Sequence, residues 1–423
     1  MSGGAVAAGA APIDLADAAS LRRGLRRAER QKRVGAFLLT VPLLACVVVV
    51  FLVPLLGMVW LSVANPTMHE YMPRTVVALR DWQGTSLPPE AAYAAVAADL
   101  RADFHHHTFG RVAKRLNEEW PGAFTLIAKT TFRTAHLTPD KPWKQALVQI
   151  DSRWGKLKVW QVMKRESPWV TADFYLSALD LQYGPHGRIE AMPSYDRVNI
   201  RLFIRTGWMS ALITVLTVLL GYPLAYWISR MPEHRANLVM IAVLLPFWTS
   251  LLVRITAWIV LLQPQGVVDS VLVAANLVPG NERPHLIFDA LGTIVVMTQV
   301  LLPFMVLPLY SVMRGIPDSY VRAAISLGAH PWRAFWQVFA PMTLPGISAG
   351  VLLVFILAIG YYITPELVGG QSGQFISNRI AYNVQESLNW GLAAALGTLL
   401  TVITLLLFAI FNFFAGIGRI SLG

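Results

Sequence analysis

The sequence contains few charged residues and almost no cysteine. Charged residues make up 14% of its 423 residues and hydrophobic residues 55%, whereas a soluble domain carries about 25% charged residues. This balance excludes an ordinary soluble domain and indicates a protein that lies in a bilayer. The single cysteine, Cys46, lies within a long apolar run, so the chain offers neither a disulfide framework nor a Cys-x-x-Cys metal site.

Motifs for catalysis and cofactor binding are also missing. The chain has no Gly-x-x-x-x-Gly-Lys-Ser/Thr loop, whose backbone amides would hold the phosphates of ATP. No nucleophile is paired with a base by any motif, and His105, His106 and His107 have no cysteine or carboxylate cluster at metal-ligand spacing. We therefore expect a chain that is no enzyme and has no catalytic residue, no cofactor and no metal site.

The net charge of +11 is explained by membrane topology rather than by nucleic acid, for which no binding module is visible. Lys and Arg accumulate in short loops on the cytoplasmic side of a membrane. Basic residues precede the first apolar run in residues 22–33, and Arg230, Arg235, Arg314 and Arg322 follow the second and fourth runs. We therefore expect a multi-pass protein of the inner (plasma) membrane with both termini in the cytoplasm.

A membrane-spanning helix needs about 20 mostly apolar residues. Six segments meet this condition, at about 34–63, 203–229, 238–262, 287–313, 346–364 and 392–415. They predict an all-α membrane protein with six transmembrane helices. The expected domains are a basic cytoplasmic tail at 1–33, the first transmembrane helix at 34–63, an extracytoplasmic insert at 64–202, a transmembrane core at 203–415 and a cytoplasmic tail at 416–423.

The insert differs in composition from the rest of the chain. Residues 65–200 contain 17 Lys and Arg and 14 Asp and Glu, close to the balance of a soluble domain. Alanine content and apolar spacing predict helices at 89–100, 143–150 and 175–181. We expect a mainly helical domain whose core contains Trp120, Trp143, Trp154, Trp160 and Trp169.

The third apolar run contains an arginine, Arg254, near its middle. A charged side chain there costs about 2.5–3.5 kcal/mol unless it faces protein or water. We expect Arg254 to point into the helix bundle, on one helical face with Phe247, Ser250, Trp258 and Leu261. Two roles remain open: a structural ion pair or carbonyl clamp between helices, and a place on the route of a solute.

A polar segment, residues 314–345, separates the fourth and fifth apolar runs. Its pattern predicts a short helix, a break at Gly328 fixed by Pro331, and a second helix that leads back into the membrane. Its alanines permit close docking, so we expect a soluble partner to hold it; a helix lying on the membrane surface is the alternative. The residues expected at this contact are Arg322, Ala323, Ala324, Leu327, Gly328, Ala329, Pro331, Trp332 and Phe335.

Four motifs, in order, resemble those of the spermidine/putrescine-type permeases of ABC importers. Residues 322–329, ending in Leu-Gly-Ala, resemble the coupling loop of this family. Residues 245–258 carry a similar Pro-Phe-Trp-x-Ser, Arg and Ala-Trp pattern, and residues 302–310 and 360–370 supply the other two matches. The resemblance covers about residues 203–415, and it implies an ABC-permease fold with its coupling loop at 314–345.

The resemblance also implies partners. Two copies of an ABC ATPase subunit, which bind ATP and Mg, would hold the coupling loop. A second and different permease would complete the pathway, and an extracytoplasmic solute-binding protein would deliver a small solute. A polyamine is the leading expectation, and its route would offer carboxylates and aromatic faces for cation–π contact. The expected pathway residues are Trp248, Ser250, Arg254, Trp258, Asp289, Tyr361, Tyr362 and Glu366.

Three departures from the family pattern keep alternatives open. Arg322 stands where the coupling loop usually has Glu, Asp269 stands where Asn is usual, and the insert is not a standard part of the family. Arg254 would repel an unpaired polyamine and suits an anionic or zwitterionic solute, such as an amino-acid-like compound or a phosphonate. Two alternatives come from other classes. One is an ATP-independent secondary transporter or channel, which would normally show inverted repeats. The other is a membrane-anchored receptor whose external insert binds a ligand while the spans relay a signal.

Overall fold

The structure is a computed structural model that describes residues 32, 35, 37–137, 140–184, 188–276, 278–279 and 286–415. The tail predicted at 416–423 and most of the tail predicted at 1–33 lie outside the described residues. Contacts divide the chain into two compact units, Met1–Trp60 and Leu61–Gly423. Each unit is described by itself.

The first unit contains one long apolar helix. Its described residues include the π-helical turn η1 (Val48–Leu52) and the start of helix α2 (Val53–Leu61), within a candidate membrane span of 25 residues at Phe37–Leu61. Such a helix is about 37 Å long, and the hydrocarbon core of a bilayer is about 30 Å thick. The first predicted span is therefore confirmed as a helix long enough to cross a membrane.

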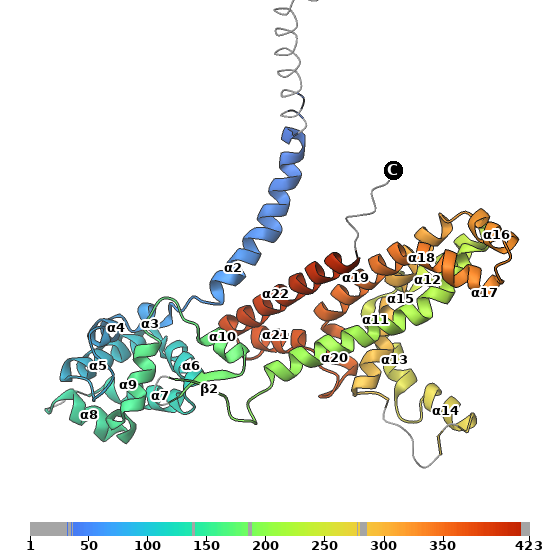
Figure 1. Ribbon diagram of the computed structural model, residues 1–423. Coiled ribbons are helices and arrows are strands. Elements are labelled where there is room, and N and C mark those ends of the chain that lie inside the picture. Colours follow the sequence, from blue (N-terminus) through green and yellow to red (C-terminus); the bar gives the residue numbers. More distant parts are fainter. Residues whose placement is uncertain are drawn as a thin grey trace, which may run out of the picture. The chain divides into compact units, whose positions relative to one another are not determined.

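Four long helices dominate the second unit: α11 (Asn199–Ser229), α15 (Ala290–Arg314), α19 (Leu344–Gly360) and α22 (Trp390–Ala415) (Figure 1). The shorter elements between them are α12 (Glu233–Trp248), α13 (Leu251–Leu262), α14 (Val267–Ala274), α16 (Asp318–Ser326), α17 (Pro331–Ala334), η3 (Phe335–Phe339), α18 (Ala340–Met342), α20 (Ile363–Val368) and α21 (Ile376–Gln385). The described part of the chain holds five candidate spans. It holds six, the predicted number, if Pro331–Met342 and Leu344–Gly360, bent by 57°, cross as one.

The prediction of one continuous spanning helix at about 238–262 is wrong. α12 ends at Trp248 and α13 begins at Leu251, with an extended backbone at Thr249 and Ser250. Pro246, in the last turn of α12, has no amide hydrogen with which to continue the helix, and the Thr249 hydroxyl donates to the Pro246 carbonyl at 2.8 Å. The face expected to carry both Phe247 and Arg254 is therefore split between two helices.

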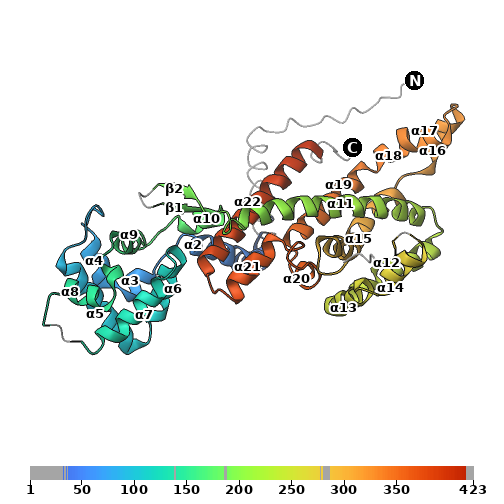
Figure 2. The same cartoon turned by 90° about the horizontal axis from the view of Figure 1, so that it is seen from below.

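The core of the bundle depends on close approach between three helices. α15 packs against both α11 and α19 (Figure 2). A Cβ on Gly221 of α11 would lie 3.0 Å from Met305 of α15, and a Cβ on Gly350 of α19 would lie 2.6 Å from the sulfur of the same methionine. Small residues allow such contact between helices in a membrane. Met305 is therefore held between two glycines and is fully buried.

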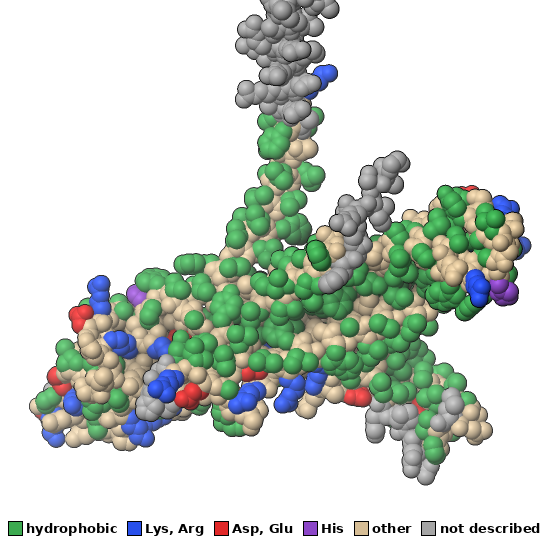
Figure 3. Space-filling model, in the orientation of Figure 1, with side chains coloured by type: hydrophobic (Ala, Val, Ile, Leu, Met, Phe, Trp, Pro, Cys, Tyr) green, Lys and Arg blue, Asp and Glu red, His purple; other side chains and the backbone are tan. Residues whose placement is uncertain are grey.

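Side-chain types are distributed unevenly over the surface. On the face seen in Figure 3, hydrophobic side chains cover the long helices, whereas charged side chains lie over the insert, along the lower edge of the bundle and at its far end. Exposed apolar residues on α11 and α22 include Trp227 and Leu405. This pattern fits helices that face lipid along their length.

The insert is mainly helical, as predicted. Its elements are α3 (Thr67–Tyr71), α4 (Pro73–Leu79), α5 (Glu90–His106), α6 (Phe109–Glu119), α7 (Ala123–Thr134), α8 (Trp143–Ile150), η2 (Ser152–Gly155), α9 (Leu157–Arg165), α10 (Asp173–Ala178) and an antiparallel pair of strands, β1 (Leu181–Tyr183) and β2 (Ile189–Ala191). The strands were not predicted, and the range ends inside α11, which begins at Asn199.

The tryptophans of the insert follow the prediction with one exception. Trp154 and Trp160 are fully buried, and Trp120 and Trp143 pack partly buried against the same core. Trp169 is 56% exposed and stacks on His69 at 4.7 Å, so its assignment to the core was wrong. It lies on a short bridge in which its carbonyl accepts from the Asn65 amide at 2.8 Å.

Several contacts between described residues join the insert to the transmembrane core, among them a hydrogen bond from Lys114 of α6 to the carbonyl oxygen of Ser387. Asp180 accepts hydrogen bonds from the backbone amides of Asn199 and Ile200, at 3.0 and 2.8 Å, and so caps the first turn of α11. α10 packs against α22, where a Cβ on Gly391 would lie 2.3 Å from the Phe174 ring. These contacts fix the last helix of the insert to the bundle.

A cluster of charges is buried beside this junction. Arg115 lies 2.5 Å from Glu166 and 3.9 Å from Asp173, and Arg165 lies 3.1 Å from Glu119. The carboxylate of Glu118 lies 3.3 Å from Arg115 as well. Four carboxylates thus face two guanidinium groups, so this cluster holds more acidic than basic side chains. Burial, and then the hydrogen bond and charge of neighbouring carboxylates, raise the pKa of Glu166 well above its usual range.

The stability of the protein is therefore expected to fall as pH rises above the range in which a glutamate ordinarily titrates. Glu166 has a higher pKa in the folded than in the unfolded protein, so folding takes up a proton at any pH between these two pKa values. The free energy of unfolding is therefore larger at acidic pH and decreases as pH rises. Glu166→Gln keeps the neutral form, so we expect a smaller loss with pH in this variant. Thermal unfolding of the full chain in detergent at several pH values measures the difference.

Asp81→Asn, at an exposed carboxylate of the insert, is the matched control and should keep the wild-type pH profile. A profile of Glu166→Gln that equals wild type would show that Glu166 does not take up this proton.

Candidate coupling segment and solute pathway

The segment predicted to bind a soluble partner has the expected helix, glycine and helix. α16 follows Pro317 and ends before Gly328, whose φ of 92° is a left-handed conformation that glycine adopts without steric cost. The amide of Ala329 donates to the carbonyl of Ala324 at 3.0 Å and closes the turn. α17, η3 and α18 then lead into α19, so the secondary structure predicted for 314–345 is confirmed.

Most of the residues expected at the partner contact lie on the surface. Leu327 is 89% exposed and Trp332 66% exposed, on either side of Gly328. Phe335 instead faces its own chain, with its ring 5.4 Å from Tyr226 and 5.7 Å from Phe339. The others divide into exposed Arg322, Ala323, Gly328 and Pro331 and half-buried Ala324 and Ala329. Leu327 and Trp332 thus form an exposed apolar tip, and Phe335 holds the segment to the bundle.

Arg230, which sequence reasoning explained by topology alone, joins this segment to α11. It follows the last residue of α11, and its guanidinium forms an ion pair with Asp318 in the first turn of α16. The same guanidinium lies over the rings of Tyr226 and Phe339, at 5.3 and 4.9 Å. Since Asp318 begins the segment and Phe339 lies near its end, one side chain contacts both.

Arg314 makes a second connection at this end of the bundle. It is the last residue of α15, and its Nη1 donates to the carbonyl oxygens of Ser229 and Met231, both at 3.0 Å. α11 and α15 are therefore tied together where the segment leaves α15. A contact between residues so far apart in sequence leaves no local pattern that could have predicted it.

Arg254 occupies the break between α12 and α13. Its Nη2 donates to the carbonyl oxygens of Pro246 and of Thr249, the latter at 3.3 Å. The last turn of a helix leaves its carbonyl groups without helical partners, so Arg254 satisfies acceptors that the break exposes. The structure therefore shows the carbonyl clamp, one of the two roles that the sequence left open.

Two other predicted pathway residues lie near Arg254. Trp258, one turn further along α13, donates from Nε1 to Oε1 of Gln299 on α15 at 3.2 Å. Tyr361, between α19 and α20, packs in the same apolar cluster as Trp258, and its phenol interacts electrostatically with Arg254. Sequence reasoning missed Gln299, although an amide inside an apolar run was a signal that could have identified it.

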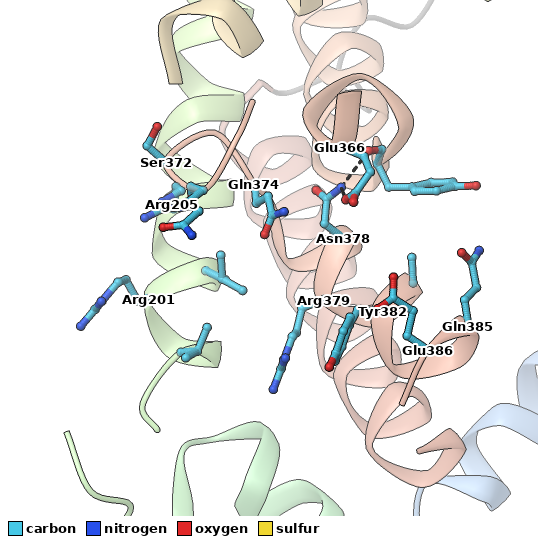
Figure 4. A pocket seen from close by; sticks show the side chains of 15 residues that line it. Arg201, Arg205, Glu366, Ser372, Gln374, Asn378, Arg379, Tyr382, Gln385 and Glu386 are labelled. Carbon is cyan, nitrogen blue, oxygen red and sulfur yellow. Dashed lines mark hydrogen bonds between the residues drawn. The ribbon is translucent and has the colours of Figure 1, made fainter. Parts of the chain in front are cut away.

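Tyr362 and Glu366 lie in a different place, together in a pocket of about 730 Å³ between α11, α20 and α21 (Figure 4). Oε2 of Glu366 accepts from Nδ2 of Asn378 at 2.7 Å. The same Nδ2 donates to the carbonyl oxygen of Tyr362 at 2.9 Å. This pocket lies at the end of α11 that joins the insert, opposite the end that carries Arg230.

The last three predicted pathway residues are not gathered with either group. Asp289 precedes α15 and accepts a hydrogen bond from the Ser372 hydroxyl. Trp248 is 91% exposed at the end of α12, and Ser250 is exposed in the break. The eight residues therefore form two groups and three separate positions in this chain, and their roles in transport stay predictions.

Arg254→Ala should destabilise the broken helix. It removes the hydrogen bond from Arg254 to the Thr249 carbonyl and one of the hydrogen bonds that the Pro246 carbonyl accepts, which lowers the free energy of unfolding by about 0.5–1.5 kcal/mol. Arg254→Lys retains a donor and should lose less. Thermal unfolding of the purified chain in detergent compares the two variants, and equal stability of both with wild type would contradict the clamp.

Arg230→Ala should loosen α16 from α11. Without the ion pair and the two aromatic contacts, the backbone amides of α16 are expected to exchange hydrogen with solvent faster, as measured by mass spectrometry. The double variant Arg230→Asp with Asp318→Arg restores the opposite charges and should recover part of the protection. Arg235→Ala, at an exposed arginine nearby, is the matched control; exchange in Arg230→Ala at the control rate would argue against the contact.

Comparison with known proteins shows which family the chain resembles. Residues 217–417 match the family model described as the binding-protein-dependent transport system inner membrane component. The spermidine/putrescine transport system permease protein PotB of Haemophilus influenzae is 34% identical over 222 residues, which are 52% of this chain and 77% of that protein. The inner membrane ABC transporter permease protein YdcU of Escherichia coli is 32% identical over 228 residues, 51% of this chain and 72% of that protein.

One solved structure is more distant. A bacterial ABC transporter involved in the import of the acidic polysaccharide alginate aligns with a TM-score of 0.45 and 16% identity, over 74% of this chain and 99% of that chain. The assignment of the chain to a family rests on the two sequence relatives. The chain belongs to the binding-protein-dependent transport system inner membrane component family, and is a multi-pass inner-membrane permease of an ABC importer rather than an enzyme.

Proposed function

We propose that this permease moves a polyamine, such as spermidine or putrescine, into the cytoplasm. An extracytoplasmic solute-binding protein delivers the solute, and two copies of a separate ATPase subunit, which bind ATP and Mg, drive its passage. A second, different permease completes the pathway. The similarity to a permease named for spermidine and putrescine supports the solute, and the exposed apolar tip at Leu327 and Trp332 is the observation that carries the coupling to an ATPase.

The apolar tip accounts for ATPase binding by burial of surface. Burying a side chain such as Leu327 contributes about 1.5–3 kcal/mol, and Trp332 adds a larger apolar area. Arg322 is exposed on the same segment, where relatives of this type usually carry Glu. The ATPase groove for this chain is therefore expected to offer an acidic side chain near Arg322.

Movement of the segment reaches the membrane through α11 and α15. Arg230 ties the segment to the end of α11, and Arg314 ties α11 to α15. Met305 then holds α15 against both α11 and α19. A displacement caused by ATP-driven closure of the ATPases is passed to these three helices together, which switches the paired permeases between inward and outward access.

The membrane topology follows from what lies at the two ends of the helix bundle. The end with Arg230, Arg314 and the coupling segment is cytoplasmic, as are both chain termini. The opposite end, with the insert and residues 361–390, is extracytoplasmic. The domains proposed are those expected from the sequence, except that the transmembrane core begins with α11 at Asn199 and not at residue 203.

The proposed pathway passes the group formed by Arg254, Trp258 and Tyr361. Aromatic faces attract the ammonium groups of a polyamine. The Arg254 guanidinium is directed at the carbonyl oxygens of Pro246 and Thr249, whose partial negative charge offsets part of its repulsion for a cation. Glu366 supplies a carboxylate at the extracytoplasmic end.

An anionic or zwitterionic solute is the second candidate, and one observation favours it. Nε of Arg254 is buried and has no hydrogen-bond partner among the described residues. A carboxylate or phosphonate group would satisfy it. Uptake measurements with an acidic solute distinguish this candidate from the polyamine.

The proposal predicts ATP-dependent uptake of radiolabelled spermidine or putrescine in vesicles. The vesicles contain this chain with the ATPase, permease and binding protein encoded beside it. Gly328→Asp should abolish uptake at unchanged assembly, because it places a charge and a side chain at a left-handed position beside the apolar tip.

Gly84→Asp makes the same change at φ 78°, in open space within the insert, and should retain uptake. If the binding protein stimulates ATP hydrolysis when it carries an acidic solute, and no polyamine is taken up, the proposed identity of the solute is wrong. Uptake retained in Gly328→Asp would overturn the coupling role of the segment.

A further inference from the structure

The pocket at the extracytoplasmic end of α11 carries an unusual concentration of arginine. Arg201 and Arg205 extend from α11 and Arg379 extends from α21, and all three line the pocket (Figure 4). Glu366 and Glu386 lie on the other side of it. We name the part lined by Arg201, Arg205 and Arg379 the arginine pocket.

None of these three arginines has a carboxylate partner among the described residues. Arg205 donates from Nη1 to the carbonyl oxygen of Gln371 at 2.7 Å. Arg379 lies over the Tyr382 ring at 5.2 Å, and its Nε is buried without a hydrogen-bond partner in the described structure. The three guanidinium groups therefore retain donors for a further ligand.

The chemistry of such a ligand follows from the charges. Guanidinium groups are always protonated and present paired N–H donors that match a carboxylate or a phosphate. Three like charges around one pocket repel one another, and an anionic group removes that repulsion. The three arginines repel a polyamine, so the arginine pocket does not fit the proposed solute, whereas Glu366 and Glu386 line the other side of the same cavity.

We propose that the arginine pocket receives carboxylate side chains of the solute-binding protein when it docks on the permease. This inference rests on the proposed function, in which that protein meets the extracytoplasmic end of the bundle. The lining favours a protein over a lipid, since Gln371, Gln374 and Gln385 offer amides to a polar surface. The few apolar residues of the lining, such as Val198 and Ala381, would hold little of an acyl chain.

Docking through this pocket has a physical consequence for the binding protein. A protein that holds a polyamine needs carboxylates around its own ligand, because the ligand is a cation. Carboxylates at the rim of that site face the permease during delivery. The arginines then attract carboxylates, the same kind of group with which the binding protein holds the solute. This attraction orients the docked binding protein.

The test measures binding between the two proteins in nanodiscs that contain the complete transporter in phosphatidylcholine with phosphatidylglycerol. The probe is the binding protein that supports uptake, loaded with spermidine and labelled with a fluorophore. Arg201→Glu and Arg379→Glu are each expected to weaken its affinity at least tenfold, and added salt should weaken wild type more than either variant. Arg80→Glu reverses an exposed charge on the insert and should leave the affinity unchanged.

Three outcomes would overturn the inference. Unchanged affinity in both pocket variants would show that the arginines do not meet the binding protein. A loss that disappears in nanodiscs of phosphatidylcholine alone would assign the pocket to an anionic lipid. Unchanged affinity with an altered KM for uptake would assign it to the solute route.

The wild-type complex separates this inference from the proposed function. Absence of ATP-dependent uptake in wild type would refute the proposed function itself. Uptake in wild type, with affinity and uptake both unaffected by Arg201→Glu and Arg379→Glu, would refute only the docking site. Recovery of affinity when a binding-protein Glu→Arg variant is paired with Arg379→Glu would identify the contacting carboxylate.

Discussion

Close contact at Met305 is the constraint on which the transmembrane core depends. A Cβ at Gly350 would lie 2.6 Å from its sulfur and a Cβ at Gly221 3.0 Å from its side chain. A larger residue at either position would therefore force Met305 to move, and the two glycines leave room for the three central helices to approach one another. Lipid supplies no hydrophobic force to hold helices together, and packing of this kind replaces it. The same contact places the coupling segment and the arginine pocket on one connected set of helices.

The charges of this chain are concentrated where elements meet. Arg254 pairs with the carbonyl groups of a broken helix, Arg314 with the end of a neighbouring helix, and Arg115 with buried carboxylates beside the junction of the insert. A charge buried in an apolar surrounding is costly unless polar groups compensate it. Breaks and helix ends supply such groups, so basic residues and interruptions of the helices occur together.

Local patterns predicted much of this structure, and tertiary contacts account for the rest. The helices of the insert and the turn at Gly328 follow from spacing and from glycine itself. The break after Trp248 was missed because apolar residues continue on both sides of Thr249 and Ser250, with Pro246 as the one warning. Trp169 was misplaced because composition does not indicate which tryptophans face the core. Arg230 and the arginine pocket depend on residues that only folding brings together.

The hydrogen bonds of Asp180 to the start of α11 mean that the insert and the core do not separate at the boundary suggested by composition. A natural or engineered loss of the whole insert would also remove the cap of a spanning helix. α10 belongs to both parts, because it packs on α22 and also places Asp173 beside Arg115 and Arg165 of the preceding helices. Loss of the residues before α10 would leave Asp173 buried without the two guanidinium groups that it faces.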